Sequence, residues 1–325
     1  RAFGCEPNRV SRLVRSFIQG SHAGGLLTTA KHYPGHGNTS EDSHHELPTV
    51  RSSREELQQI ELPPFQAAIE AGVSMIMTAH VCYPALDPNG RCATLSRPIV
   101  TELLREQLGF QGAVVSDSLL MEGVKQQGNS EGDLAVQAIN AGVDFLLDIA
   151  DPVSALNEME RAVEEGRLEE SRIEQAFDRI WQLKTTTFEK PSESINDESI
   201  QADVLPKMEQ LVTSVSRDSI TVASACEGQL PLSTENPLCT IVIKTVNPSG
   251  STNEEPLAAE LREHFSNCQY FELGPGAVKE EYDEAKNACQ AAEQVLIGLV
   301  VKPAAWHRFG LKPELVTYVN ELWAN

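Results

Sequence analysis

Apolar residues in the first part of the chain follow two alternating patterns. Helical spacing runs from Val10 to Ile18, and Gly20 is predicted to end that helix. Short, continuous apolar runs are typical of strands buried on both faces. These runs predict strands over residues 26–30, 74–81, 112–120 and 143–149. Four successive strand–helix units predict a parallel α/β sheet, with half the units of a (β/α)8 barrel.

A polar stretch with few apolar positions follows and is interpreted as a linker over residues 188–204. Beyond it, residues 205–325 return to alternating strands and helices. Strands are predicted over residues 219–223, 239–246, 269–273 and 294–301. The pattern therefore predicts two α/β domains, 1–187 and 205–325, separated by the linker.

The composition of the chain limits the classes of molecule that it is expected to bind. The chain has 325 residues, of which 41% are hydrophobic, and a formal net charge of −21. An acidic surface repels phosphate backbones, so a nucleic-acid partner is not expected. The sequence contains no apolar run long enough for a membrane span. No feature indicates an oligomeric state.

The cysteines and the two ends of the chain are the features that relate to the cellular compartment of the protein. Seven widely spaced cysteines without a CxxC pair suggest neither a zinc site nor a disulfide framework, and they favour a reducing, cytoplasmic compartment. The chain opens on Arg1 and ends at Asn325 inside a helix-like pattern. We therefore expect a fragment of a longer gene product, and secretion stays open because a signal could precede Arg1.

Histidines concentrate in one loop. Six of the eight lie within the first 80 residues, most of them in the segment 31–48, KHYPGHGNTSEDSHHELP. Three interpretations compete: a metal site built from His32, His36 and His44, a purely structural loop, or acid/base chemistry. In the last, Asp42 lies two residues from His44 and could orient its ring as a proton donor near neutral pH.

Polar residues also follow the predicted strands. Lys31, His32, His80 and Asp117 come at strand ends, and in a (β/α)8 barrel that edge holds the active site. Asp117 ends the apolar run VVSDSLL, where packing gives no reason for a carboxylate. It is interpreted either as a helix N-cap or as a nucleophile or metal ligand at the barrel rim.

The motifs KHYPGHG, DSHHELP, MTAHVCYPALDPNGRCATLS and LLREQLGFQGAVVSDSLLMEGV together resemble glycoside hydrolase family 3, in its β-N-acetylglucosaminidase branch. The resemblance covers residues 1–184. It implies the C-terminal half of a (β/α)8 TIM-type barrel, and the second block resembles a partial α/β sandwich domain. The first half of the barrel would be missing.

The resemblance also assigns roles. It implies that Asp117 is the catalytic nucleophile, that His44 is the general acid/base, and that Asp42 orients His44. Arg1, Lys31 and His32 would hold hydroxyl groups of the amino sugar. No metal or organic cofactor is implied. Ser118 departs from the family, which often has a second aspartate there, and we expect this change to tune activity without abolishing it.

A retaining glycosidase needs a nucleophile below the sugar and a proton donor at the leaving oxygen. The expected substrate is an oligosaccharide with terminal β-linked N-acetylglucosamine, from cell-wall muropeptides or chitin. A helix starting after Asp117 is expected to help keep its carboxylate ionised. Three alternatives stay open: a phosphorylase of the same glycosides, a β-glucosidase of the same family, and an inactive truncated fragment.

Overall fold

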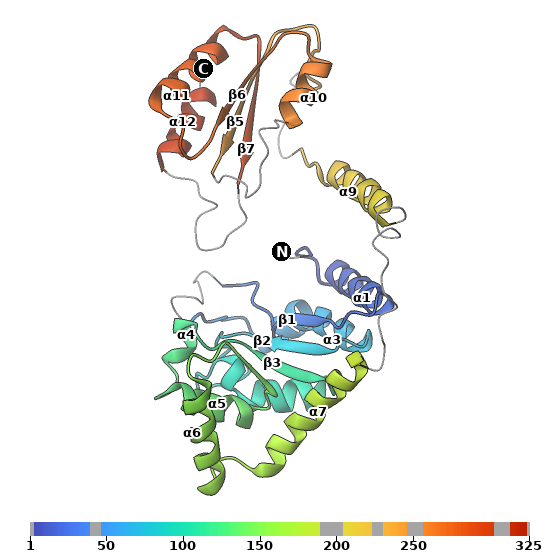
Figure 1. Ribbon diagram of the computed structural model, residues 1–325, viewed down its shortest axis with the longest axis vertical. Helices are drawn as coiled ribbons and strands as arrows, with labels where there is room; N and C mark the ends of the chain where they lie inside the picture. The colour runs from blue at the N-terminus through green and yellow to red at the C-terminus, as the bar shows by residue number, and fades with distance from the viewer. Residues whose placement is uncertain are drawn as a thin grey trace. The chain divides into compact units, whose positions relative to one another are not determined.

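The computed structural model describes residues 3–39, 47–188, 204–222, 230–245, 256–301 and 313–323. The chain divides into two compact units, Arg1–Ile200 and Gln201–Asn325. Figure 1 shows both, and each is treated by itself. The predicted linker, apart from its first and last residues, lies outside the described residues. The domain boundaries drawn from the sequence therefore stay a prediction.

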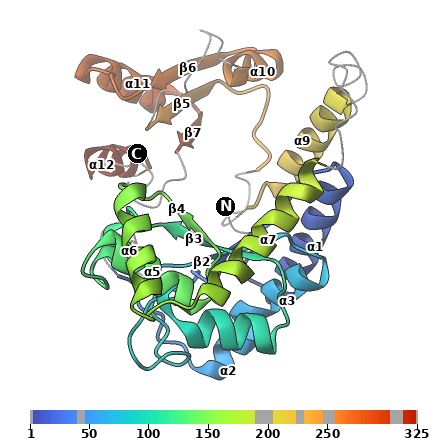
Figure 2. The same ribbon diagram turned by 60° about the horizontal axis from the view of Figure 1, so that its bottom comes forward.

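The first unit is built on a four-stranded parallel sheet. Its strands are β1 (Thr29–Tyr33), β2 (Met75–Thr78), β3 (Ala113–Ser118) and β4 (Phe145–Leu147), and they lie side by side in chain order. Helices connect the strands and lie around the outside of the sheet (Figure 2). Sequential parallel strands joined by helices confirm the predicted α/β fold of half a (β/α)8 barrel.

The helical segments of this unit are α1 (Pro7–Ala23), α2 (Arg54–Glu56), η1 (Leu57–Glu61), α3 (Leu62–Glu70), η2 (Ala93–Leu95), η3 (Pro98–Gln107), α4 (Glu122–Lys125), α5 (Glu131–Ala141), α6 (Pro152–Glu164) and α7 (Glu170–Phe188).

Ser53 begins α2 with the predicted capping box: its Oγ accepts from the Glu56 amide at 3.2 Å, and its own amide donates to the Glu56 carboxylate at 2.7 Å.

The two faces of the sheet differ in burial. Ala30, Ile76 and Val114 lie in register, and Ile76 and Val114 are fully buried against the helices. Alternate residues point to the opposite face. There Met77, Val115 and Phe145 are aligned, and Phe145 keeps 36% of its surface exposed. Asp117 lies two residues beyond Val115, so it belongs to this more open face.

Asp144, the residue before β4, ties the amino ends of two strands to the helices. Its buried carboxylate accepts the amide of Val114 at 2.9 Å and pairs with three arginines. These are Arg105 at 2.6 Å, Arg172 at 2.8 Å and Arg179 at 3.2 Å. The cluster lies at the end of the sheet opposite Asp117, where a barrel fold places stabilising contacts.

Two boundaries differ from the prediction in this unit. Helix α1 continues past Gly20 to Ala23, because the Gly20 carbonyl still accepts the amide of Gly24 at 3.1 Å. A glycine inside a helix costs only about 1 kcal/mol, which packing of the helix offsets. The first strand spans Thr29–Tyr33 and not residues 26–30, so Lys31 and His32 lie within it.

The second unit holds a three-stranded parallel sheet in the order β6-β5-β7. Its elements are α9 (Leu205–Ser219), β5 (Leu238–Lys244), α10 (Pro256–His264), β6 (Cys268–Leu273), α11 (Lys279–Ala291), β7 (Gln294–Val300) and α12 (Pro313–Trp323). The strand predicted over 219–223 is wrong for its described part. Ser219 closes α9, and the next three residues belong to no strand.

Candidate active site at the carboxyl ends of β1 and β3

The site is centred on a contact between Asp117 and His32. Asp117 comes one residue before the end of β3, and His32 lies in β1, two strands away in the sheet. The Nε2 atom of His32 lies 3.4 Å from Oδ2 of Asp117, and both side chains are partly exposed, at 29% and 22%. The fold thus brings together two residues that are 85 positions apart in sequence (117 − 32).

The other carboxylate oxygen of Asp117 is held by its own backbone. Its Oδ1 accepts the Ser118 amide at 2.8 Å, so Oδ2 is the oxygen turned toward His32. The predicted helix cap at Asp117 is wrong. Helix α4 begins at Glu122 with Met121 as its N-cap, and no side-chain hydrogen bond caps it. A helix dipole acts within about one turn, so α4 is not placed to stabilise this carboxylate.

A buried histidine supports the backbone next to Asp117. His80 is 1% exposed, its Nε2 donates to the Ser118 carbonyl at 2.9 Å, and its Nδ1 lies 2.8 Å from Oγ1 of Thr94. Burial lowers the pKa of the His80 imidazole, which favours the neutral ring. His80 comes at the end of a predicted strand, and its type alone gives it no role. The signal that could have identified it is a histidine inside the apolar run SMIMTAHV.

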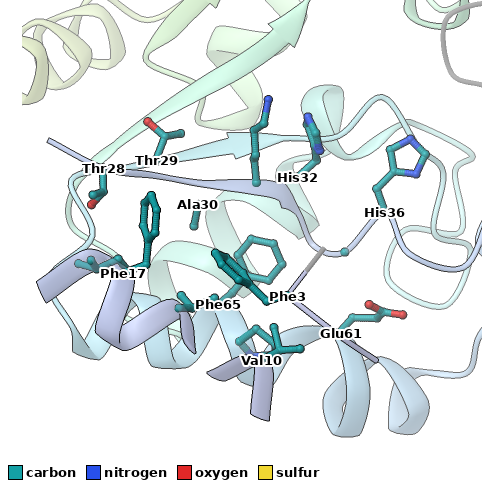
Figure 3. Close-up of a pocket in the computed structure, with 16 residues that line it drawn as sticks. Phe3, Val10, Phe17, Thr28, Thr29, Ala30, His32, His36, Glu61 and Phe65 are labelled. Carbon is teal, nitrogen blue, oxygen red and sulfur yellow. The ribbon is translucent and has the colours of Figure 1, made fainter. Parts of the chain in front are cut away.

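Lys31 and His32 also border a cavity of about 390 Å³ beside β1. Its lining comes from β1, α1, α3 and the loop after β1; among the described residues, Asp117 is not part of it. Figure 3 shows Phe3, Phe17 and Phe65 gathered under β1. His36 and Glu61 lie at one end, and burial raises the pKa of the Glu61 carboxyl.

The loop after β1 depends on a glycine. Gly35 has φ +136°, its carbonyl accepts the Tyr83 hydroxyl at 2.9 Å, and a Cβ added to it would meet Glu61 at 2.7 Å. Because an L side chain would be strained there and would also clash, only glycine fits. The next glycine, Gly37, has no such crowding, since its nearest contact would be 3.8 Å from Glu61 Oε2.

Replacing Gly35 with alanine is therefore expected to lower the free energy of unfolding by about 1–3 kcal/mol, from backbone strain plus the displaced Glu61. The measurement is urea unfolding monitored by hydrogen exchange of β1 and η1. Gly37→Ala is the matched control and should change stability by less than about 1 kcal/mol. Equal losses in the two variants would contradict the role assigned to Gly35.

Three residues that the resemblance places in the site, Arg1, Asp42 and His44, lie outside the described residues. Lys31 is exposed on β1, and His32 is the one sugar-binding candidate found against Asp117. His32 and His36 lie near each other, with ring centroids 6.1 Å apart. Within the described part of the chain, no group of three or more His, Cys, Asp or Glu side chains could hold a metal ion.

Within the described residues, no helix combines the length and the apolar content that crossing a bilayer requires.

Known proteins match both the sequence and the fold. A β-hexosaminidase A of Pseudoalteromonas piscicida is 37% identical over an alignment of 205 residues, which covers 57% of this chain and 34% of that protein. A β-hexosaminidase of Tolumonas auensis is 43% identical over 148 residues, covering 45% of this chain and 43% of its own length. The chain thus spans about half or less of the length of these curated relatives.

Among solved structures, a glycoside hydrolase family 3 β-N-acetylglucosaminidase from Paenibacillus sp. str. FPU-7 matches 98% of this chain and 60% of its own, with a TM-score of 0.81 and 31% identity. Residues 1–183 match the family model described as the glycosyl hydrolase family 3 N terminal domain. That match includes the whole β1–β4 sheet, Asp117 and His32. The chain belongs to glycosyl hydrolase family 3.

Proposed function

We propose that this chain acts as a retaining exo-β-N-acetylglucosaminidase that hydrolyses terminal β-linked N-acetylglucosamine, with Asp117 as its nucleophile. The observation that carries the proposal is the position of the Asp117 carboxylate. It lies at the carboxyl end of β3, on the open face of the sheet, with Oδ2 3.4 Å from His32 and Oδ1 held by the Ser118 amide. The β-hexosaminidase relatives support the amino-sugar substrate.

The chemistry follows from this placement. In a retaining mechanism, a carboxylate attacks the anomeric carbon, and the leaving oxygen takes a proton from an acid. The Oδ2 atom of Asp117 attacks, and the resulting glycosyl ester is then hydrolysed by water. Because Oδ1 stays bonded to a backbone amide, the carboxylate keeps one orientation through both steps.

His32 is proposed to bind a sugar hydroxyl beside the nucleophile, together with Lys31 and Arg1. Its ring nitrogen is close enough to Asp117 to fix the position of both groups. His44 is proposed as the acid that protonates the leaving oxygen and as the base that then activates water, with Asp42 orienting its ring. A histidine can work in both directions near neutral pH. The substrates proposed are cell-wall muropeptides and chitin-type oligosaccharides.

The proposal is tested by incubating the chain with an aryl N-acetyl-β-glucosaminide and with the matching β-glucoside, each with and without inorganic phosphate. We expect free N-acetylglucosamine with retained β configuration, at a rate that phosphate does not change. Sugar 1-phosphate formed only when phosphate is present would instead identify a phosphorylase. Turnover of the glucoside alone would overturn the amino-sugar assignment, and no turnover of either would overturn the activity.

A further inference from the structure

The side chain of His80 is buried and contacts the backbone of Ser118, the residue that follows the nucleophile. It is 1% exposed and comes two residues after the end of β2, the strand between β1 and β3. A buried imidazole is costly unless both ring nitrogens are satisfied. Both are satisfied here: Nε2 by the Ser118 carbonyl at 2.9 Å, and Nδ1 by the Thr94 hydroxyl at 2.8 Å.

The hydrogen bonds fix one proton of the ring. A carbonyl can only accept, so Nε2 carries the proton toward Ser118. In the neutral ring Nδ1 accepts from Thr94, whose hydroxyl also lies 3.2 Å from the Ala79 carbonyl and 2.8 Å from the Thr78 hydroxyl. Thr78 and Thr94 are fully buried, so these hydrogen bonds are shielded from water. A shielded, fully satisfied network holds its members in one arrangement.

Ser118 connects this network to the reaction. Its carbonyl is held by His80, and its amide donates to Oδ1 of Asp117 at 2.8 Å. The orientation of the carboxylate thus depends on where the Ser118 backbone lies. His80 holds the Ser118 carbonyl together with the Met121 amide, which donates to the same oxygen at 3.2 Å.

We propose that His80, backed by Thr94 and Thr78, is the positioning residue of the nucleophile: it anchors Ser118, whose amide aims the Asp117 carboxylate. The role rests on the proposed function. His80 does not touch substrate and exchanges no proton with it. A misplacement of about 1 Å at a reacting group costs about 10²-fold in rate, which is the size of effect expected when the anchor is lost.

The test compares His80→Leu, which removes both ring nitrogens, with His80→Gln, which keeps an N–H donor near Nε2. With aryl N-acetyl-β-glucosaminides of good and poor leaving groups, we expect His80→Leu to lower kcat about 10²-fold for both, with KM little changed. His80→Gln should recover most of the rate. Thr94→Val frees Nδ1 while leaving the ring in place, and it should produce a smaller loss in the same direction.

The split between kcat and KM separates positioning from folding, because a misplaced nucleophile slows the chemical step while substrate binding is kept. Rescue by His80→Gln gives the same separation, since this variant restores the donor near Nε2 without the ring. A residue that merely supports folding would leave kcat per folded molecule unmoved.

Stability supplies a second readout that needs no activity. Since burial lowers the pKa of His80, the unfolded chain binds this proton first as pH falls below about 6.5. The wild type should lose stability from there downward, and His80→Gln should lack that part of the loss. Two neighbouring groups also act on the His80 ring. The charge of Asp117 favours its protonated form, and the charge of His36 opposes it.

The matched control is His22, a partly buried histidine with the same kind of partner. Its Nε2 lies 3.1 Å from Oγ1 of Thr28, below the amino end of β1. His22→Leu should leave kcat and KM unchanged. If the wild type turns over substrate but the His80 variants match it in kcat and KM, the positioning role is overturned alone. If the wild type turns over nothing, the proposed function falls first and the positioning role falls with it.

Discussion

Replacing Asp117 with alanine is expected to lower kcat by about 10⁴-fold or more, because a retaining glycosidase without its nucleophile cannot form the glycosyl ester. The side chain is only partly buried, and within the described part of the chain Oδ2 is in close contact with His32. The variant should therefore fold with little loss of stability. The measurement is turnover of an aryl N-acetyl-β-glucosaminide with a good leaving group.

Adding azide to the Asp117→Ala variant tests the same role by recovery of activity. A small anion can enter the space left by the Asp117 carboxylate and attack the anomeric carbon directly. Asp117→Ala should then regain turnover with azide and give a glycosyl azide of inverted, α configuration. An α product from the variant and a β product from the wild type would identify Asp117 as the group that attacks. Rescue that yields only the β product would contradict this role.

Asp148 offers a matched control. It follows β4 directly, is exposed, and lies at the same edge of the sheet as Asp117. Its φ of +53° is one that asparagine tolerates well, so Asp148→Asn changes charge with little strain. We expect Asp148→Asn to keep activity within a few-fold of the wild type. Comparable losses in the Asp148 and Asp117 variants would mean that charge at this edge matters and that no single carboxylate is the nucleophile.

Replacing Asp144 with asparagine is expected to cost about 3–5 kcal/mol of stability, because it removes the negative charge that three guanidinium groups share. The carboxylate is fully buried, and the side chains of Arg105 and Arg172 keep only 11% and 13% exposure. Burial lowers the pKa of Arg105 to about 10, and Asp144 opposes that shift. Without Asp144, the arginines would repel one another in a region with little water.

Hydrogen exchange is the suitable measurement, because it reports on this unit without signal from the second one. The Val114 amide, bound to the Asp144 carboxylate at 2.9 Å, and its neighbours in β3 should exchange faster in the variant. The control is Glu70→Gln, which breaks an exposed pair with Arg15 at 2.9 Å and should cost about 0–1 kcal/mol. A loss under about 1 kcal/mol in Asp144→Asn would contradict the central role of this carboxylate.

Much of the fold could be predicted from the pattern of apolar residues. Buried parallel strands appear as continuous apolar runs, so β2, β3 and β4 were located to within a few residues. Strand boundaries were less secure where packing competes with local preference. Residues 26–28 are apolar enough for a strand, yet β1 starts at Thr29, where it pairs with Met75 of β2. Only the partner strand determines that register.

Part of the candidate site could likewise be predicted from the sequence, and part of it could not. Asp117 was identifiable because a carboxylate closes an apolar strand, and the histidine-rich loop because its composition is unusual. No spacing in the chain indicated that His32 and Asp117 would meet, since β2 lies between their strands. The role of His80 was equally hidden, because a histidine at the end of an apolar run does not show which backbone group it binds.

By itself, therefore, the sequence indicated which residues are candidates for the chemistry, which segments are buried in a parallel sheet, and which family the chain resembles. These features depend on residue type and local periodicity, and both are present in the chain before it folds. The contact of His32 with Asp117, the anchoring of Ser118 by His80 and the pairing of Asp144 with three arginines were decided only by the tertiary structure. Each joins residues far apart in sequence, and strand order and register alone bring them within hydrogen-bonding distance.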